Sequence, residues 1–251
     1  MLEASGVTRC FGGMRAVDDV SFAVALDGIT GLIGPNGAGK TTMFNLLAGS
    51  LSLTSGTVHL NGRRLDRLRA DRRVALGLAR TFQIPRPFAA MSILENVLLG
   101  AQHQSGERFW TNWVSPHRVG REERANIERA EALIEFVALG RLSRAPARTL
   151  SGGQRKLLEL ARGLMTEPRL MLLDEPAAGV APALLDTIAD RILALNARGV
   201  GFLVIEHNME FVARLCRRVI VMSQGGMLRD GTPDEVLADA RVVDAFLGSA
   251  A

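Results

Sequence analysis

The 251-residue sequence contains no tyrosine, and its aromatic content is only 5%. Its two cysteines, Cys10 and Cys216, are far apart and belong to no cluster of histidines and cysteines. This pattern excludes a structural zinc site and indicates a reducing compartment. The longest apolar stretches, such as 199–205 and 169–174, fall far short of the roughly 20 residues that a membrane-spanning helix needs. The first residues lack the basic start and apolar core of a signal peptide, so we expect a protein that is soluble on its own.

Long tracts of lysine and arginine, which are typical of proteins that bind nucleic acid, are also missing. The net charge is +4, and basic and acidic residues are mixed along the chain. Apolar residues make up 47% of the sequence, which is enough for a substantial core and excludes general disorder. The length suits one large domain or two small ones. We therefore expect a globular protein without a nucleic-acid partner.

Apolar strands alternate with helices in the second half of the chain. The pattern predicts helices over 151–166, 182–197 and 208–215, strands over 169–173, 202–205, 218–222 and 226–230, and short helices around 233–238 and 240–247. Buried strands that alternate with helices predict a mostly parallel sheet with both faces covered. In the first sixty residues, short strands are expected over 20–25, 28–34 and 56–62, with a helix that ends at Gly49 between the last two.

The middle of the chain, from about 66 to 149, is arginine-rich and is expected to be helical. An apolar face formed by Ile127, Ala130, Ile134 and Val137 predicts a helix over 121–138. The predicted fold class is therefore α/β, with a core of mostly parallel sheet, an antiparallel β region and a helical insertion. We expect the catalytic core in residues 1–84 and 166–251 and the helical subdomain at about 85–165.

The stretch GPNGAGKT, Gly34 to Thr41, matches the G-x-x-x-x-G-K-[ST] phosphate loop between an apolar strand and a helix. Its glycines let the backbone surround phosphates, and the N–H groups at the helix start face negative charge. Lys40 is expected to reach the β- and γ-phosphates, and the Thr41 hydroxyl to bind Mg²⁺. The predicted ATP contacts in this loop are Gly34, Pro35, Asn36, Gly37, Ala38, Gly39, Lys40, Thr41 and Thr42.

Asp174 and Glu175 follow an apolar strand that we expect beside the strand feeding the phosphate loop. Asp174 would then bind Mg²⁺ and Glu175 would act as general base for the attacking water. His207 follows another apolar strand and could contact the γ-phosphate. The alternatives are that Asp174 caps the next helix and that His207 is an ordinary polar strand end.

The motifs GPNGAGKT, RTFQ, LSGGQ, MLLDEP and VIEH occur in an order that resembles the ATP-binding subunits of ABC transporters, over essentially the whole chain. The resemblance implies that Gln83 senses Mg²⁺ and the γ-phosphate, and that Phe11 stacks on adenine where relatives usually have tyrosine. It also implies that the LSGGQ residues contact the nucleotide of a second subunit: Leu150, Ser151, Gly152, Gly153 and Gln154. The alternatives are core packing for Phe11 and a simple capped helix start for LSGGQ, in which two glycines would have no purpose.

Finer features resemble the ATPase subunits of high-affinity branched-chain amino acid importers, among them LDEPAAGVAP, VIEHNME and the loop with Trp110 and Trp113. Related systems for urea, short amides or lipopolysaccharide export share many of them. A soluble ABC ATPase acting on nucleic acid or ribosomes is a further alternative, but such proteins usually carry two cassettes or a long coiled-coil insertion. At Ala178 and Ala181 most relatives have serine and aspartate, so a contact by that aspartate across the dimer is not expected here.

The resemblance also implies partners and a location. The partners are a second ABC ATPase subunit, identical or homologous, integral membrane permease subunits and, indirectly, a secreted substrate-binding protein. The protein would be peripheral, at the cytoplasmic face of the membrane. We expect residues near 83–96 to couple to the permease, with Phe88 and the stretch SILENV as the main contacts.

Overall fold

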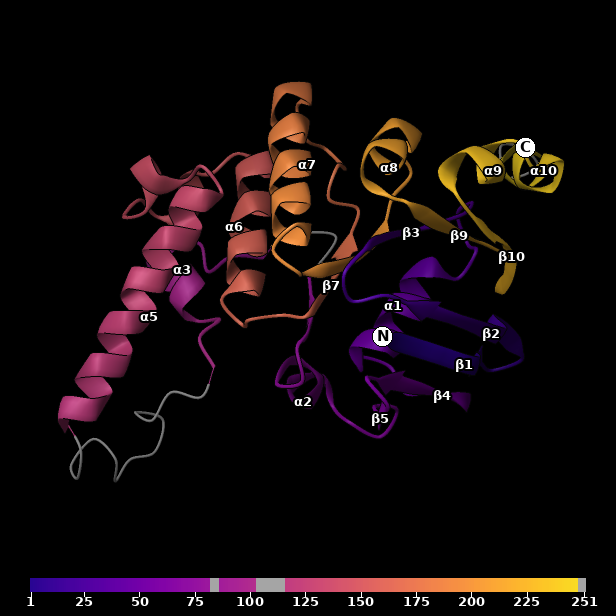
Figure 1. Cartoon of the computed structure of the whole chain (residues 1–251), viewed down its shortest axis with the longest axis horizontal. Helices are drawn as coiled ribbons and strands as arrows, with labels where there is room; N and C mark the ends of the chain where they lie inside the picture. Colours follow the sequence, from indigo (N-terminus) through magenta and orange to yellow (C-terminus); the bar gives the residue numbers. More distant parts are fainter. Residues whose placement is uncertain (82–85, 103–115, 248–251) are drawn as a thin grey trace. The chain divides into compact units, whose positions relative to one another are not determined.

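The computed structural model describes residues 1–81, 86–102 and 116–247 (Figure 1). The chain divides into two compact units, each made of separate stretches of sequence. The core unit comprises Met1–Gln83, Arg169–Ala178 and Ile192–Ala251, and the helical unit comprises Ile84–Pro168 and Gly179–Arg191. The stretch Gly179–Arg191 lies outside the range 85–165 that the sequence predicts for a helical subdomain.

The core unit contains two sheets. The antiparallel sheet has the strand order β2-β1-β4-β5, and the six-stranded sheet has the order β10-β9-β3-β8-β7-β6. Neighbours in the six-stranded sheet are parallel except for the pair β9 and β10. The strands are β1 Leu2–Phe11, β2 Met14–Val24, β3 Ile29–Ile33, β4 Ser55–Leu60, β5 Arg63–Arg64, β6 Leu78–Arg80, β7 Leu170–Asp174, β8 Gly201–Ile205, β9 Arg218–Ser223 and β10 Gly226–Gly231. The helices of this unit are α1 Lys40–Ala48, α2 Ala70–Val74, α8 Met209–Leu215, α9 Pro233–Leu237 and α10 Ala240–Leu247. The α/β prediction is confirmed.

Three details of the predicted strands are wrong. The sequence did not predict β1, whose alternation is broken where its pairing with β2 shifts register between Ala4 and Val7 and again before Arg9. It assigned β6 to a helical region, although this short strand pairs with β7. Finally, β7 does not lie beside β3, because β8 lies between them. Strand order depends on how the crossovers pack, and the local sequence of a strand does not specify it.

The helix α1 is buried in the core that the two sheets share. Its residues Met43, Phe44, Leu46 and Leu47 belong to a cluster that contains side chains of both sheets. Arg73 is also fully buried, and its Nη1 donates to the carbonyls of Leu46 and Leu47 at 2.7 and 2.6 Å. A cation that satisfies the last carbonyls of a helix stabilises its C-terminus. The carboxyl end of α1 is therefore fixed, and its amino end points into the site described below.

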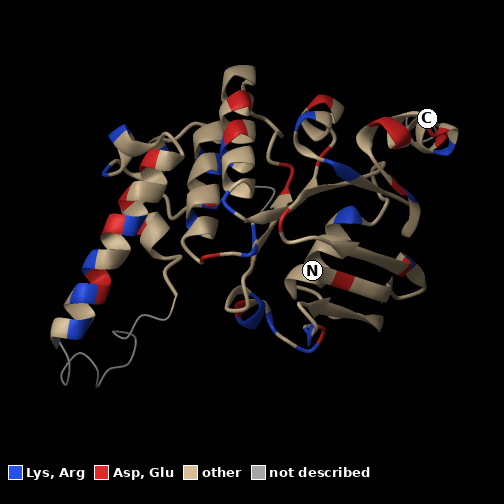
Figure 2. Ribbon diagram, in the orientation of Figure 1, with Lys and Arg blue, Asp and Glu red and all other residues tan. Residues whose placement is uncertain are grey.

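The helical unit is built from amphipathic helices. Basic and acidic residues are interspersed along α5 (Figure 2). Its residues Ala130 and Ile134 are buried, as predicted. Ile127 is only partly buried. The elements are α3 Ile93–Leu98, α5 Pro116–Phe136, the 3₁₀ turns Gly140–Leu142 and Ala147–Thr149, α6 Gly152–Leu164, and α7 Pro182–Asn196, which extends into the core unit. None of the helices within the described ranges is long and apolar enough to cross a membrane.

The first turn of α6 packs closely against the start of α7. A Cβ atom added to Gly153 would overlap Cδ2 of Leu184 and would come within 3.2 Å of Cγ1 of Val180. At Gly152 the nearest atom to such a Cβ is the carbonyl oxygen of Gly179, at 3.7 Å, an ordinary contact. The packing of this chain therefore disfavours a side chain at 153 but not at 152.

This difference makes a matched pair of variants. Gly153→Ala should lower the free energy of unfolding by about 1–3 kcal/mol, because Leu184 must move to admit the methyl group. Gly152→Ala should leave stability unchanged or raise it by up to about 1 kcal/mol, because alanine is the better helix former. Urea unfolding followed by circular dichroism measures both. Equal effects of the two substitutions would contradict the packing described.

The buried thiol of Cys216 predicts an unusual alkaline behaviour. Burial, with a further contribution from the charge of Glu206, raises the pKa of Cys216 to about 12. Because the folded state holds this proton more tightly than the unfolded state, stability is fully present below pH 9 and falls as the pH rises toward 12. The free energy of unfolding should drop by about 1–2 kcal/mol between pH 8 and pH 10.

Few other groups complicate this measurement, since the sequence has no tyrosine and only two lysines, Lys40 and Lys156. Urea unfolding at the two pH values should show the loss in the wild type and not in Cys216→Ala. Cys10→Ala, which removes the other thiol, is the control and should keep the loss. An identical pH dependence of wild type and Cys216→Ala would refute the assignment.

Candidate functional site

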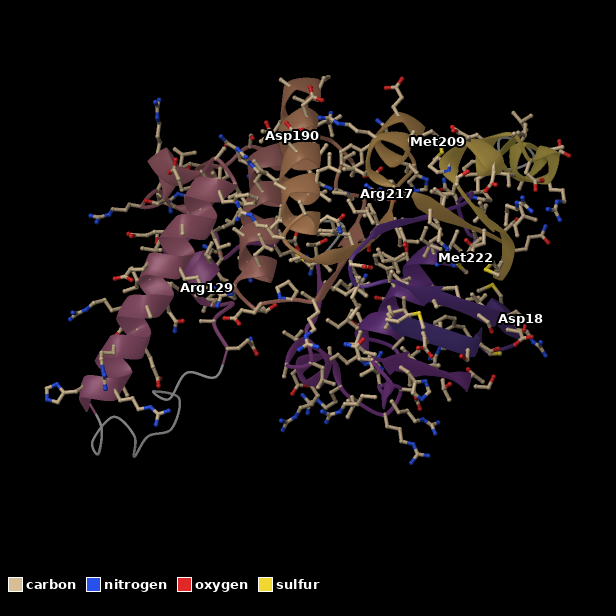
Figure 3. All side chains as sticks on the ribbon, in the orientation of Figure 1. Asp18, Arg129, Asp190, Met209, Arg217 and Met222 are labelled. Carbon is tan, nitrogen blue, oxygen red and sulfur yellow. The ribbon has the colours of Figure 1, made fainter. Side chains whose placement is uncertain are left out.

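The phosphate loop is held in shape by backbone contacts at two of its glycines. Gly34 and Gly39 have φ angles of +147° and +95°, in the region that favours glycine. A Cβ at Gly34 would overlap the carbonyl oxygen of Met222 (labelled in Figure 3), and a Cβ at Gly39 would overlap that of Ala16. The loop therefore packs directly against the backbones of β9 and β2. Both glycines are needed because a side chain at either position would overlap these carbonyls.

Lys40 begins α1 and is only 6% exposed. Its Nζ donates to the carbonyls of Gly34 and Pro35 at 2.6 and 2.8 Å, inside its own loop. Burial lowers the pKa of Lys40, and the charges of Glu175 and Asp174 partly oppose this shift. No side chain caps the amino end of α1, where Gly39 is the N-cap residue. The first N–H groups of the helix and the ammonium group are thus arranged as in a site for an anion.

A cleft of about 570 Å³ opens over this loop. It is lined by Met14, Arg15, Ala16, Asn36, Gly37, Ala38, Gly39, Lys40, Thr41, Thr42, Glu175, His207, Gln224 and Gly225. Gly34 and Pro35 do not line the cleft. They stabilise the loop because their carbonyls accept hydrogen bonds from Lys40. Sequence reasoning missed Met14, Arg15 and Gln224, because only the pairing of distant strands brings them to the loop.

Phe11 does not line this cleft. It ends β1 with 41% of its surface exposed, and the guanidinium carbon of Arg9 lies 4.7 Å from the centre of its ring. Such exposure does not fit the alternative of plain core packing. Phe11 pairs across the hairpin with Met14, which does line the cleft. Phe11 is therefore paired with a residue that lines the cleft, and its ring already lies against a cation.

The acidic strand end is organised by its neighbours. Asp174 is buried and pairs with Arg80, whose Nη2 lies 3.1 Å from Oδ2. Glu175 has a left-handed backbone, φ +48°, and its N–H donates to the carbonyl of Ile205 at 3.0 Å. The next helix begins at Pro182, so Asp174 does not cap it and that alternative is wrong.

Glu175 and His207 meet at the edge of the cleft. The Nε2 atom of His207 lies 2.9 Å from Oε1 of Glu175, and both side chains line the cleft. The contact arises because β7 and β8 are adjacent and parallel, with Asp174 opposite Ile205, so that the loops after both strands emerge together. His207 is therefore more than a polar strand end, since its ring is paired with a carboxylate inside the cleft.

The sequence analysis also missed Glu206, which is buried between these two loops. Its carboxylate accepts hydrogen bonds from the backbone N–H groups of Ala177 and His207, at 2.6 and 3.0 Å. A glutamate directly after an apolar strand was the only signal for it in the sequence. That signal is weak, because most polar residues at strand ends are exposed.

The LSGGQ segment starts α6 in the helical unit. Leu150 is buried, and Ser151 is the N-cap residue: its Oγ accepts from the N–H of Gln154, whose Oε1 accepts from the N–H of Ser151. The segment is thus a capped helix start. The expectation that its glycines have no purpose within the chain is wrong for Gly153, because of Leu184, but Gly152 is exposed and a Cβ atom there would make only an ordinary contact.

Some predicted residues lie elsewhere. Gln83, Trp110 and Trp113 fall outside the described residues. Ala178 and Ala181 are exposed, and the carbonyl of Ala181 accepts from the N–H groups of Leu184 and Leu185 at the start of α7. Across the described residues, no group of three or more histidine, cysteine, aspartate or glutamate side chains could hold a metal ion.

Comparison with known proteins gives consistent results. A family model described as "ABC transporter" matches residues 17–178. The chain is 38% identical over 251 residues to the high-affinity branched-chain amino acid transport ATP-binding protein BraF of Pseudomonas aeruginosa, covering 100% of this chain and 98% of that protein. It is 36% identical to a probable branched-chain amino acid transport ATP-binding protein, LivG, of Archaeoglobus fulgidus, covering 99% and 96%.

Solved structures agree. A nucleotide-free ATP-binding cassette from an ABC transporter superposes with a TM-score of 0.85 at 34% identity, covering 98% of each chain. A cassette in its ADP conformation gives a TM-score of 0.86 at 34% identity, covering 99% of this chain and 98% of that one. With its phosphate loop, acidic strand end and LSGGQ helix in place, the chain belongs to the ABC transporter family, as one of its ATP-binding cassettes.

Proposed function

We propose that this chain is the ATP-hydrolysing subunit of an ABC importer for branched-chain or related amino acids. The observation that carries the proposal is the cleft in which the phosphate loop faces the paired side chains of Glu175 and His207. The choice of substrate is supported by relatives named for branched-chain amino acid transport, at 34% to 38% identity over nearly their whole length.

The chemistry follows from the residues of the cleft. The loop N–H groups and Lys40 bind the β- and γ-phosphates of ATP, which requires the ammonium group to leave the carbonyls of Gly34 and Pro35. Water attacks the γ-phosphorus, the bond to the ADP oxygen breaks, and the water's proton passes to the carboxylate of Glu175. His207, in contact with Glu175, orients that carboxylate and contacts the γ-phosphate. Phe11, beside the cleft, stacks on adenine with its ring face.

The residues present fit a magnesium ion. Thr41 is an exposed residue of the cleft and Asp174 is a carboxylate at the end of β7, so both offer the oxygen ligands that Mg²⁺ prefers. Gln83 is the third proposed ligand. Mg²⁺ commonly binds through one or two carboxylates together with substrate phosphates, so a dedicated cluster of acidic side chains is not required. When bound, the ion neutralises negative charge on the phosphates.

We infer that the active site is completed by a second subunit. We propose the core unit as the catalytic core, and the helical unit, which adds Gly179–Arg191 to the predicted range of about 85–165, as the helical subdomain. The Ser151 hydroxyl accepts from Gln154, so its own hydrogen remains for a phosphate oxygen. Gly152 keeps the helix start free of a side chain where the backbone must approach the γ-phosphate of the other subunit. Gln154 lies beside it, while the buried Leu150 and Gly153 support this helix start from within.

The partners follow from this role. They are a second cassette, identical or homologous, and integral membrane permeases that bind the chain at the cytoplasmic face of the membrane. A secreted substrate-binding protein acts indirectly. Phe88, 55% exposed and covered on one side by Arg162, is a proposed permease contact. Affinity purification from cells should recover integral membrane proteins, whereas recovery of ribosomes or DNA would favour a soluble ABC ATPase instead.

Glu175→Gln should abolish turnover without abolishing ATP binding. The amide keeps the size of the side chain and cannot take a proton from water, so the ATPase rate should fall by at least about 100-fold. ATP should then hold two subunits together, which size-exclusion chromatography with light scattering would detect. A turnover number close to that of the wild type would exclude Glu175 as the base.

Gly152→Asp tests the contribution of the second subunit. Aspartate suits the first turn of a helix, so the fold should survive, but its charge opposes an incoming phosphate. ATPase activity should fall by at least about 100-fold, while the ATP dissociation constant of the monomer stays within about twofold. Gly120→Asp makes the same change at an open position of α5 and is the control. Loss of ATP binding by the monomer would argue against a role in the partner's site.

A further inference from the structure

Glu206 joins the two loops that carry the reactive pair. Its Oε1 accepts from the N–H of Ala177 at 2.6 Å, in the loop after β7. Its Oε2 accepts from the N–H of His207 at 3.0 Å and from that of Asn208 at 3.4 Å, in the loop after β8. One buried side chain thereby fixes the spacing between two backbone segments about 30 positions apart in sequence.

The burial of this carboxylate needs a reason. Glu206 is 3% exposed, and burying a charged carboxylate is costly unless hydrogen bonds compensate. Bonds from backbone N–H groups to a carboxylate are charge-assisted and roughly twice as strong as neutral ones. An apolar residue of the same size would leave the N–H groups of Ala177, His207 and Asn208 without this acceptor. The carboxylate therefore has a role beyond packing.

The geometry of Glu175 indicates that role. Its left-handed backbone, φ +48°, is a strained conformation for a residue with a side chain, and it persists only where the surroundings hold it. Two contacts flank it: its own N–H donates to the carbonyl of Ile205, and Ala177, two residues later, donates to Glu206. On the other side, Glu206 holds the N–H of His207, the residue that contacts the Glu175 carboxylate.

We propose that Glu206 is a positioning residue for ATP hydrolysis, which holds the Glu175 turn and the His207 loop at the separation that their 2.9 Å contact requires. The inference rests on the proposed function, since it concerns the same hydrolytic step. Glu206 is not among the residues that line the cleft, so it acts through its two neighbours. A displacement of about 1 Å at a reacting group can cost on the order of 100-fold in rate.

The test compares two variants of Glu206. Glu206→Ala removes both carboxylate oxygens, whereas Glu206→Gln keeps one oxygen as an acceptor and places an N–H group opposite the other donor. ATP turnover should fall by about 30–100-fold in the alanine variant and by about 3–10-fold in the glutamine variant. KM for ATP and the dissociation constant should stay within about twofold, because the phosphate loop is untouched. In a Glu175→Gln background, Glu206→Ala should cause little further loss, since its effect passes through Glu175.

Glu159→Ala is the matched control, a buried carboxylate on α6 in the helical unit, and should retain turnover. If Glu206→Ala does not fold, the glutamine variant alone decides the question. Unchanged turnover in both variants, a raised KM with normal turnover, or full additivity with Glu175→Gln would each overturn the proposal.

Amide hydrogen exchange gives a readout that does not depend on ATP. Residues 175–178 and 206–208 should exchange faster in both Glu206 variants than in the wild type, and an unchanged rate would also overturn the proposal. If wild-type protein failed to hydrolyse ATP with its partners present, the proposed function would fail. Faster exchange in the variants would still support the bridge between the loops.

Discussion

Two backbone carbonyls, those of Met222 and Ala16, set the shape of the phosphate loop by their approach to Gly34 and Gly39. The loop can follow this path only because neither position carries a side chain. The amino end of α1 is then fixed between two strands of different sheets, and Lys40 is directed into the loop. The cleft exists because this one constraint is met, and the chemistry proposed for it depends on the same contacts.

The contact between Glu175 and His207, the pair proposed for hydrolysis, depends on strand register in a similar way. Glu175 and His207 are 32 positions apart and belong to different loops. They meet because β7 and β8 are neighbours in register, so that the chain leaves both strands at the same edge of the sheet. Glu206 then adds a direct bond between the loops. The proposed catalytic geometry thus depends on paired strands and on the hydrogen bonds of one buried carboxylate.

The sequence predicted most elements after residue 151 to within one or two residues, because their strands are wholly apolar and short turns separate them from amphipathic helices. The sequence-based prediction failed for features that depend on contacts between distant parts of the chain. The bulges of β1 hide its alternation, the position of β8 between β3 and β7 depends on crossover packing, and the need for Gly153 arises from Leu184, 31 positions away. Among the site residues, the phosphate loop was predicted from its motif, whereas Arg15, Gln224 and Glu206 required the structure.

The two glycines of LSGGQ have a consequence for how this segment can vary. Gly153 is favoured by packing against the chain's own α7, while Gly152 meets nothing of its own chain closely. Selection on 153 would therefore act through the amount of folded protein in the cell, and, under the proposed contact with a second subunit, selection on 152 would act through assembly with a partner. A duplicated copy that lost its partner could change Gly152 while it kept Gly153. The residues found at these two positions in a descendant would therefore show whether it still assembles with a partner or only folds.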